Sequence, residues 1–102
     1  MNPPSPKTPS SKAVVIRRAI LDELAAIGGT HNHDALAVVL KGKGHPVSRD
    51  EVAEQMRWLA EHGMMAIEQL GVFVVGDITM RGRDIADGSV TYDGISPFKS
   101  AI

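Results

Sequence analysis

The chain has 102 residues, 43% of them hydrophobic, a formal net charge of −1 and no cysteine. This length fits one small domain with an aliphatic core, and the lack of cysteine excludes a disulfide scaffold and thiolate metal sites. No segment has the pattern of a signal peptide or a membrane span, so we expect a cytoplasmic protein without a membrane partner.

Charge is distributed unevenly along the chain. Residues 1–18 carry four Lys and Arg residues without an acid, and residues 41–49 carry three. Phosphate neutralisation supplies much of the affinity for nucleic acid. In a chain with no overall basic excess, these two segments are therefore where a nucleic-acid contact would be expected.

The two ends of the chain are predicted to lie outside the folded domain. Residues 1–11 contain four of the six prolines and almost nothing apolar, so they are predicted to form a flexible Pro/Ser-rich tail. The domain is predicted over residues 12–88, and residues 89–102 are predicted to be an irregular C-terminal tail.

A first helix is predicted from Lys12 to the Gly28-Gly29 pair. Its apolar ridge consists of Ile16, Ile20, Leu24 and Ile27, spaced four, four and three apart. Further apolar residues widen this surface: Val14, Leu21 and Ala25. A broad buried side is the simpler interpretation, and a homodimer interface is the alternative.

A second helix is predicted from Asn32 or His33 to Lys41, with the side chain of Asn32 or Asp34 as its cap. The following turn, residues 42–46, contains two glycines and ends at Pro46. Proline cannot continue a helix, so the second and third helices are separate elements with helix-turn-helix connectivity.

The third helix has the best-specified start in the sequence. Ser48 at the N-cap and Glu51 three residues later form a capping box, and the flanking Val47 and Val52 form a hydrophobic staple. A buried stripe follows at helical spacing: Val52, Met56, Leu59 and Ala60. Trp58 is predicted to cover part of the core. Polar residues are left at the outer face: Arg49, Asp50, Glu54, Gln55 and Arg57.

A β-hairpin and a short helix complete the predicted domain. Gly63 ends the third helix, residues 65–70 and 72–78 form two strands, and Leu70-Gly71 is the turn. Thr79 is predicted to cap a last helix that continues to about Asp87, with Ile85 and Ala86 facing inward.

Two short motifs resemble known sites without meeting their requirements. His31, His33 and Asp34 could ligate a metal, but no further ligand accompanies them, so the histidines are predicted to be solvated and no metal is expected. The Gly42-Lys43-Gly44 loop lacks the ending of a nucleotide-binding loop, and it serves either as a DNA-backbone contact or as a polar connection. No residues form a credible catalytic set, so we expect neither an enzyme nor a cofactor.

The segments Val47-Ser48-Arg49-Asp50-Glu51-Val52, Leu59-Ala60-Glu61-His62-Gly63 and Ile78-Thr79-Met80-Arg81-Gly82 occur in the order of elements just described. Over about residues 13 to 88 this pattern resembles the small winged-helix proteins of Mu-like bacteriophages and prophages, which are commonly described as ArsR-like transcriptional regulators. The resemblance implies an α+β, mostly α fold: a winged helix-turn-helix with three helices, a β-hairpin wing and a short C-terminal helix. It also implies a homodimer in the host bacterial cytoplasm, with the third helix in a major groove of DNA.

A phage-encoded regulator that binds double-stranded DNA is the first functional hypothesis. Its expected contacts are Lys41, Lys43, Arg49, Gln55 and Arg57, with Arg17 and Arg18 as additional backbone contacts. Alternatively, Arg49 and Arg57 form surface pairs with Glu54 or Glu61. The second hypothesis is a winged-helix module that binds a host or phage protein and not DNA, which the acidic third helix and the uncharged hairpin tip favour.

Overall fold

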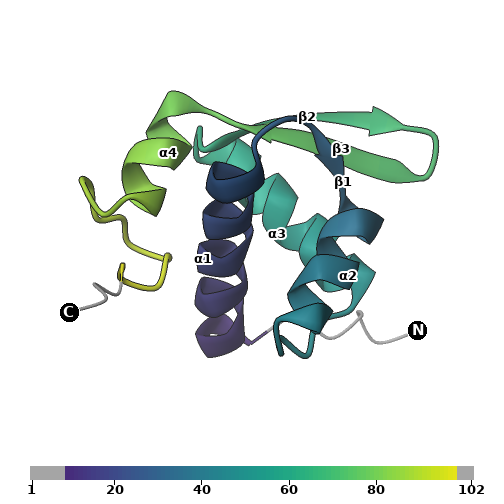
Figure 1. Cartoon of the computed structure of the whole chain (residues 1–102), viewed down its shortest axis with the longest axis horizontal. Coiled ribbons are helices and arrows are strands. Elements are labelled where there is room, and N and C mark those ends of the chain that lie inside the picture. Colours follow the sequence, from purple (N-terminus) through teal and green to yellow (C-terminus); the bar gives the residue numbers. More distant parts are fainter. Residues whose placement is uncertain (1–8, 99–102) are drawn as a thin grey trace, which may run out of the picture.

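The computed structural model describes residues 9–98. This part forms four helices and a three-stranded antiparallel sheet, so the fold is α+β and mostly helical (Figure 1). The elements in chain order are α1 (Ser10–Ile27), β1 (His31–Asn32), α2 (His33–Gly42), α3 (Arg49–Glu61), β2 (Met65–Leu70), β3 (Phe73–Ile78) and α4 (Met80–Ala86).

The first helix begins two residues before its predicted start. The carbonyl of Pro9 accepts hydrogen bonds from the amides of Lys12 and Ala13 at 3.0 and 2.8 Å, so Ser10 already belongs to the helix. The rest of the predicted tail, residues 1–8, lies outside the described residues. At the other end the helix stops before Gly28, as predicted, and the Gly28 amide donates to the carbonyl of Leu24 at 2.8 Å.

The second and fourth helices begin at side-chain caps. Asn32, and not Asp34, caps α2, because its Oδ1 accepts from the amide of Ala35 at 2.8 Å. Thr79 caps α4 as predicted, with its hydroxyl oxygen accepting from the amide of Gly82 at 3.1 Å. Both caps satisfy an amide that would otherwise lack a partner in the first helical turn.

The predicted hairpin is present, and a third strand joins it. Leu70 pairs with Phe73, which makes Gly71 and Val72 the two-residue turn, one residue later than predicted. Gly71 has a φ of +60°, the value that a type II′ turn requires at its first central position. The unpredicted strand β1 pairs with the other side of β3, so the strand order is β1-β3-β2.

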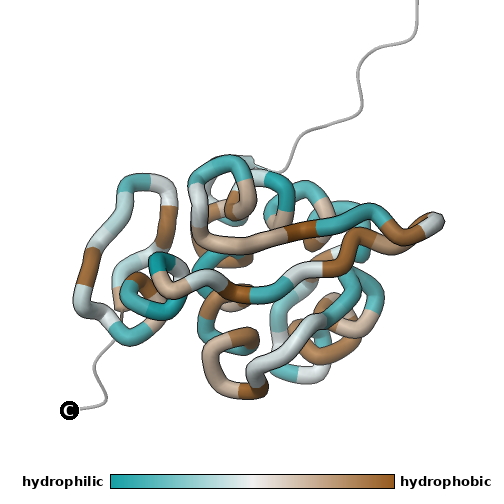
Figure 2. The backbone as a smooth tube through the Cα atoms, turned by 90° about the horizontal axis from the view of Figure 1, so that it is seen from above, coloured by the Kyte–Doolittle hydropathy of each residue, from teal (hydrophilic) through white to brown (hydrophobic). Residues whose placement is uncertain are grey.

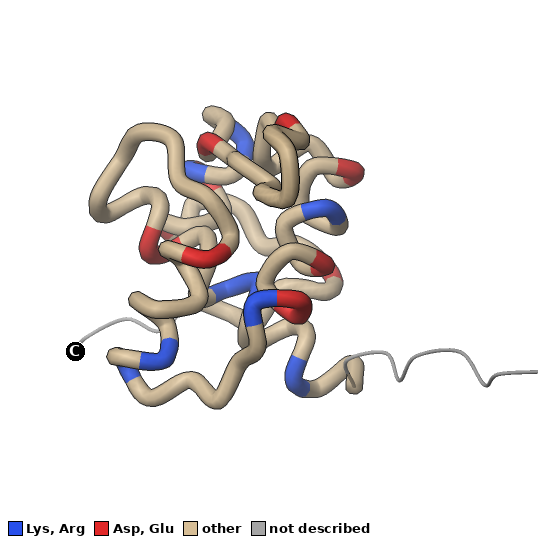
Figure 3. The backbone as a smooth tube through the Cα atoms, turned by 90° about the vertical axis from the view of Figure 1, so that its right-hand side faces the viewer, with Lys and Arg blue, Asp and Glu red and all other residues tan. Residues whose placement is uncertain are grey.

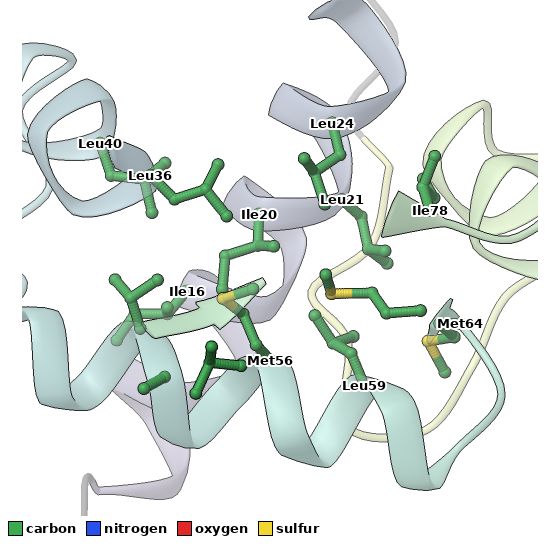
Figure 4. Close-up of a cluster of buried hydrophobic side chains, with 14 of the residues drawn as sticks. Ile16, Ile20, Leu21, Leu24, Leu36, Leu40, Met56, Leu59, Met64 and Ile78 are labelled. Carbon is green, nitrogen blue, oxygen red and sulfur yellow. The ribbon is translucent and has the colours of Figure 1, made fainter. Parts of the chain in front are cut away.

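The core lies where α1, α2 and α3 meet the inner face of the sheet (Figure 4). Its largest fully buried aliphatic residues include Ile16, Ile20, Leu21, Leu24, Leu36, Leu40, Met56, Leu59 and Ile85. The predicted ridge of α1 is confirmed except at Ile27, which is half exposed because the helix ends there, beyond the core.

Residues 89–98 contain no helix or strand, yet they pack against the helices. Ile95 is buried, and the amide of Ser96 donates to the carbonyl of Val14 in α1 at 3.2 Å. In Figure 1 this segment lies beside α4 and α1, on the side of the molecule opposite the hairpin tip.

Candidate nucleic-acid interface

The start of α3 is fixed by the predicted capping box. The hydroxyl of Ser48 accepts from the amide of Glu51, and the carboxylate of Glu51 accepts from the amide of Ser48, both at 3.0 Å. Val47 and Val52 are both buried, as a hydrophobic staple requires. The first turn of α3 therefore presents its side chains from a rigid backbone.

The outer face of α3 carries charges of both signs. Arg49 and Arg57 are exposed as predicted, together with Asp50, Glu54 and Glu61. The helix therefore offers three carboxylates and two guanidinium groups to a ligand, an acidic balance for a surface that would meet phosphate. Figure 3, which views the molecule from the side of α2 and the hairpin tip, likewise shows cations and anions interspersed without a large field of one sign.

The predicted exposure of Gln55 is wrong. Its side chain is buried, with 2% of the residue exposed, and its Oε1 accepts from Nε of Arg17 at 2.7 Å. The contact between α1 and α3 covers this position, and the hydrogen bond from Arg17 of α1 satisfies the buried amide oxygen.

Arg17 is partly exposed and joins three parts of the molecule. Besides its bond to Gln55, it donates from Nη1 to the carbonyl of Gly94 at 2.9 Å, and its guanidinium lies 3.8 Å from the ring centroid of Trp58. Burial lowers the pKa of Arg17 from its ordinary value, while the negative charge of Glu54 raises it. Trp58 is half buried against the core, as predicted.

Arg18 is buried and caps the end of α4. Its guanidinium donates to the carbonyls of Ile85 and Ala86, at 3.0 and 2.5 Å, and pairs with Asp22 at 3.0 Å. Both carbonyls belong to the last turn of α4, where acceptors lack i+4 partners, and the carbonyl of Ile85 also accepts from the amide of Gly88 at 3.2 Å. The two arginines predicted as additional DNA contacts therefore both connect elements of the domain, Arg18 from a buried position and Arg17 from a partly exposed one.

Cations remain exposed where α2 meets α3. Arg49 pairs with Asp34 at 3.4 Å, not with the predicted Glu54 or Glu61, and its side chain is 68% exposed. Lys43 pairs with Glu23 of α1 at 2.6 Å, and Lys41 is exposed. The Arg49–Asp34 pair is exposed and worth little in water, so a phosphate group could replace Asp34 as the partner of Arg49. Glu23, in contrast, is buried, so Lys43 also compensates a buried carboxylate.

A groove lies between this corner and the hairpin. Its volume is about 530 Å³, and it is lined by Asn32, Asp34, Ala35, Ala37, Val38, Lys41, Arg49 and Phe73. We call it the α2 groove. It brings together Lys41 and Arg49, two of the predicted site residues, whereas Arg57 lines a different hollow on α3.

The hairpin tip is apolar and uncharged. Figure 2 shows the hairpin extending from the body of the molecule. Val72 at its turn is 80% exposed, and the flanking Leu70 and Phe73 are 49% and 37% exposed. This tip has no cation with which to contact a phosphate group.

The prediction of solvated histidines is wrong for His33, at the start of α2, while His31 in β1 is partly exposed. His33 is buried, and its Nδ1 accepts from the amide of Val74 at 3.0 Å, while Nε2 of His31 lies 2.7 Å from the carbonyl of Gly28. Both therefore serve the junction between α1, α2 and β3. Within residues 9–98, no three His, Asp or Glu side chains are grouped so that they could hold a metal ion.

A cluster of rings lies over the end of α3 and was not predicted from the sequence. His62 stacks on Trp58 with ring centroids 3.8 Å apart, and Tyr92 packs edge-on against both rings while its hydroxyl lies 2.8 Å from Nδ1 of His62. The i, i+4 spacing of Trp58 and His62 was the available signal for the first contact. No local sequence pattern predicted the contact of Tyr92, which lies 30 residues after His62.

Within the described part of the chain, none of the helices combines the length and apolar character needed to cross a membrane. No known family model matches the chain. It is 38% identical over 79 residues to a protein of Escherichia phage Mu described as uncharacterized protein gp26, and the match covers 78% of this chain and 82% of the phage protein. The chain belongs to the family of this phage Mu protein.

Proposed function

We propose that this protein is a winged-helix transcriptional regulator of the ArsR-like type that binds duplex DNA at the corner between α2 and α3. The element order helix, strand, helix, helix, hairpin, helix supports a winged helix-turn-helix, with α3 as the recognition helix and the β2–β3 hairpin as the wing. Membership of a phage protein family supports the phage or prophage origin that the proposal assumes.

The exposure of Arg49 in the first turn of α3 carries the proposal. The capping box holds this turn, and the arginine side chain is 68% exposed beside Lys41 in the α2 groove. Residues near the start of a recognition helix reach base edges, and Arg can bond a guanine through two hydrogen bonds. Lys41 and Lys43 then contact phosphates, and Arg57 lies further along α3. Gln55 and Arg18 are left out because they are buried, and Arg17 because Gln55, Gly94 and Trp58 already hold its guanidinium.

Fluorescence anisotropy with a labelled duplex of mixed sequence tests this function. The affinity should fall steeply between about 50 and 200 mM salt, because the release of counterions from the DNA on binding becomes less favourable as the salt concentration rises. Arg49→Glu should weaken binding at every salt concentration, whereas Arg83→Glu, the same charge change at an exposed site on α4, should have a smaller effect. The absence of binding at the lowest salt, or equal losses in both variants, would refute the proposal.

A protein-interaction module is the second candidate. The acidic balance of α3 and the apolar tip formed by Leu70, Val72 and Phe73 favour it, because neither feature attracts phosphate. In the same titration this candidate predicts no affinity for the duplex at any salt concentration.

A further inference from the structure

The C-terminal segment and the end of α4 enclose a cavity next to the guanidinium group of Arg18. The volume of this cavity is about 270 Å³, and we call it the Arg18 cavity. Its apolar lining includes Ile85, Val90, Ile95 and Phe98. Ile85 and Ile95 are buried, whereas Val90 and Phe98 are 47% and 50% exposed, so solvent reaches the cavity on their side.

Backbone hydrogen bonds hold the wall of the cavity in place. The amide of Val90 donates to the carbonyl of Asp84 in α4, and the amide of Ser96 donates to the carbonyl of Val14 in α1, both at 3.2 Å. The segment is thus tied to a helix on each side of the cavity. A cavity that is already formed without a ligand loses less free energy to ordering when a ligand binds.

The guanidinium of Arg18 retains one unused hydrogen-bond donor. A guanidinium has five N–H groups. Asp22 accepts from Nε and Nη2, and the carbonyls of Ile85 and Ala86 accept from Nη1 and Nη2. The second hydrogen of Nη1 has no acceptor among residues 9–98, although Arg18 is only 9% exposed.

This unused donor lies on the side of the guanidinium away from Asp22. Asp22 takes the edge formed by Nε and Nη2, and the two carbonyls take the edge between Nη1 and Nη2. The open position is therefore the one next to Cδ. Arg18 lines the cavity and Asp22 does not. An oxygen atom in the cavity can thus bond Nη1 without displacing a partner that Arg18 already has.

The charges at the cavity favour a neutral oxygen over a carboxylate. The positive charge of Arg18 already pairs with Asp22 at 3.0 Å, and Asp93 adds a negative charge to the lining. A carboxylate would lose the hydration of a full charge in return for one N–H donor, and Asp93 would repel it. A carbonyl oxygen costs less to remove from water and needs fewer donors.

We propose that the Arg18 cavity binds a small neutral carbonyl compound with a short apolar body. The carbonyl oxygen accepts from Nη1 of Arg18, and the apolar body packs against Ile85, Ile95 and Val90. The volume lies just below the range of roughly 300 to 1,000 Å³ that is typical of small-molecule sites. We therefore expect a ligand of about ten non-hydrogen atoms and a dissociation constant of roughly 0.1 to 10 mM. This inference goes beyond the proposed function, which depends on the corner between α2 and α3.

Three probes of nearly the same shape test the chemistry of the ligand. Acetophenone carries a neutral carbonyl group, benzoate carries a negative charge, and α-methylstyrene has a methylene group in place of the carbonyl oxygen. Binding to the full chain is measured from the shifts of backbone amide signals in proton–nitrogen NMR spectra. Acetophenone should bind roughly two- to tenfold more tightly than α-methylstyrene, the effect of one hydrogen bond, and also more tightly than benzoate. The largest shifts should occur in residues 85–98.

Val90→Phe tests the location of the site. The larger side chain should occupy part of the cavity and raise the dissociation constant of acetophenone by roughly fivefold or more. Val72→Phe, the same exchange at the 80% exposed hairpin turn, serves as the matched control and should leave the affinity unchanged. Thermal unfolding establishes that both variants are folded. Since replacing Arg18 also disturbs the end of α4, the comparison of acetophenone with α-methylstyrene tests its role in the unaltered protein.

The outcomes are independent of DNA binding. The absence of shifts at about 10 mM acetophenone would overturn the inference, because a site of this size should be occupied at that concentration. Binding of α-methylstyrene or benzoate as tight as that of acetophenone, or equal binding to wild type and folded Val90→Phe, would also overturn it. A chain that binds acetophenone as expected but has no affinity for DNA would refute only the proposed function.

Discussion

Arg18 shows at the scale of single residues how a charged side chain can serve the fold. Its guanidinium donates to two carbonyls at the end of α4 and also pairs with Asp22. Hydrogen bonds from charged groups are stronger than neutral ones, and buried carbonyls that lose their donor are costly. An arginine in a basic N-terminal segment thus has a structural use that its sequence context does not reveal.

Replacing Arg18 by methionine should destabilise the domain. Methionine keeps much of the aliphatic length but removes the donor to the carbonyl of Ala86, while the carbonyl of Ile85 keeps the amide of Gly88. The free energy of unfolding should therefore fall by roughly 1 to 3 kcal/mol. Urea denaturation measures this loss. Arg57→Met, at an exposed site on α3, serves as the control and should change stability by less than about 0.5 kcal/mol. Equal stability of the two variants would contradict the structural role of Arg18.

At the scale of elements, helix starts could be predicted because their signals are local. A capping side chain and the amide that donates to it lie three residues apart, so Ser48 with Glu51, and Thr79 ahead of α4, could be recognised from the sequence alone. The two-residue strand β1 could not, because it exists only by pairing with Gly76 and Val75, more than 40 residues away.

The same limit applies to the candidate site. The exposure of Arg49 and Arg57 followed from the period of α3. The burial of Gln55 did not, because Arg17 of another helix covers it. The pairing of Arg49 with Asp34 likewise depends on how α2 and α3 are placed against each other, which no local pattern specifies.

Ser48→Ala tests the cap of α3. The substitution removes the acceptor for the amide of Glu51, so the free energy of unfolding should fall by about 0.5 to 2 kcal/mol. Thermal unfolding monitored by circular dichroism measures the change. Ser11→Ala, at an exposed position in the first turn of α1 that makes no cap, should leave the midpoint unchanged or slightly higher. An unchanged midpoint in Ser48→Ala would mean that the capping box adds no stability.

At the scale of the whole molecule, residues 89–98 close the domain. Arg17 connects α1 to α3 through Gln55 and to this segment through the carbonyl of Gly94, while Tyr92 covers Trp58 and His62. Cation–π and ring contacts of this kind gain strength when water is excluded. The segment predicted as an irregular tail thus takes part in the fold although it has no regular secondary structure.

Gly94 is the position at which this closure can be tested. A Cβ at Gly94 would lie 2.9 Å from Cζ2 of Trp58, so Gly94→Ala should push the C-terminal segment away from the ring. Gly44 is the matched control. Its φ of +93° is nearly that of Gly94, +94°, but a Cβ there would meet nothing within 4 Å. Both variants incur the same backbone strain, and only Gly94→Ala adds the contact with Trp58.

Because Trp58 is the single tryptophan of the chain, its fluorescence reports this contact without interference. Gly94→Ala should shift the emission to longer wavelength as water reaches the ring, and it should lower the free energy of unfolding more than Gly44→Ala does, by roughly 1 to 3 kcal/mol for an overpacked contact. Gly44→Ala should leave the emission unchanged, since residue 44 lies in the turn after α2. An equal loss of stability in both variants, without a spectral shift, would mean that only backbone strain matters and that residues 89–98 do not hold Trp58 in place.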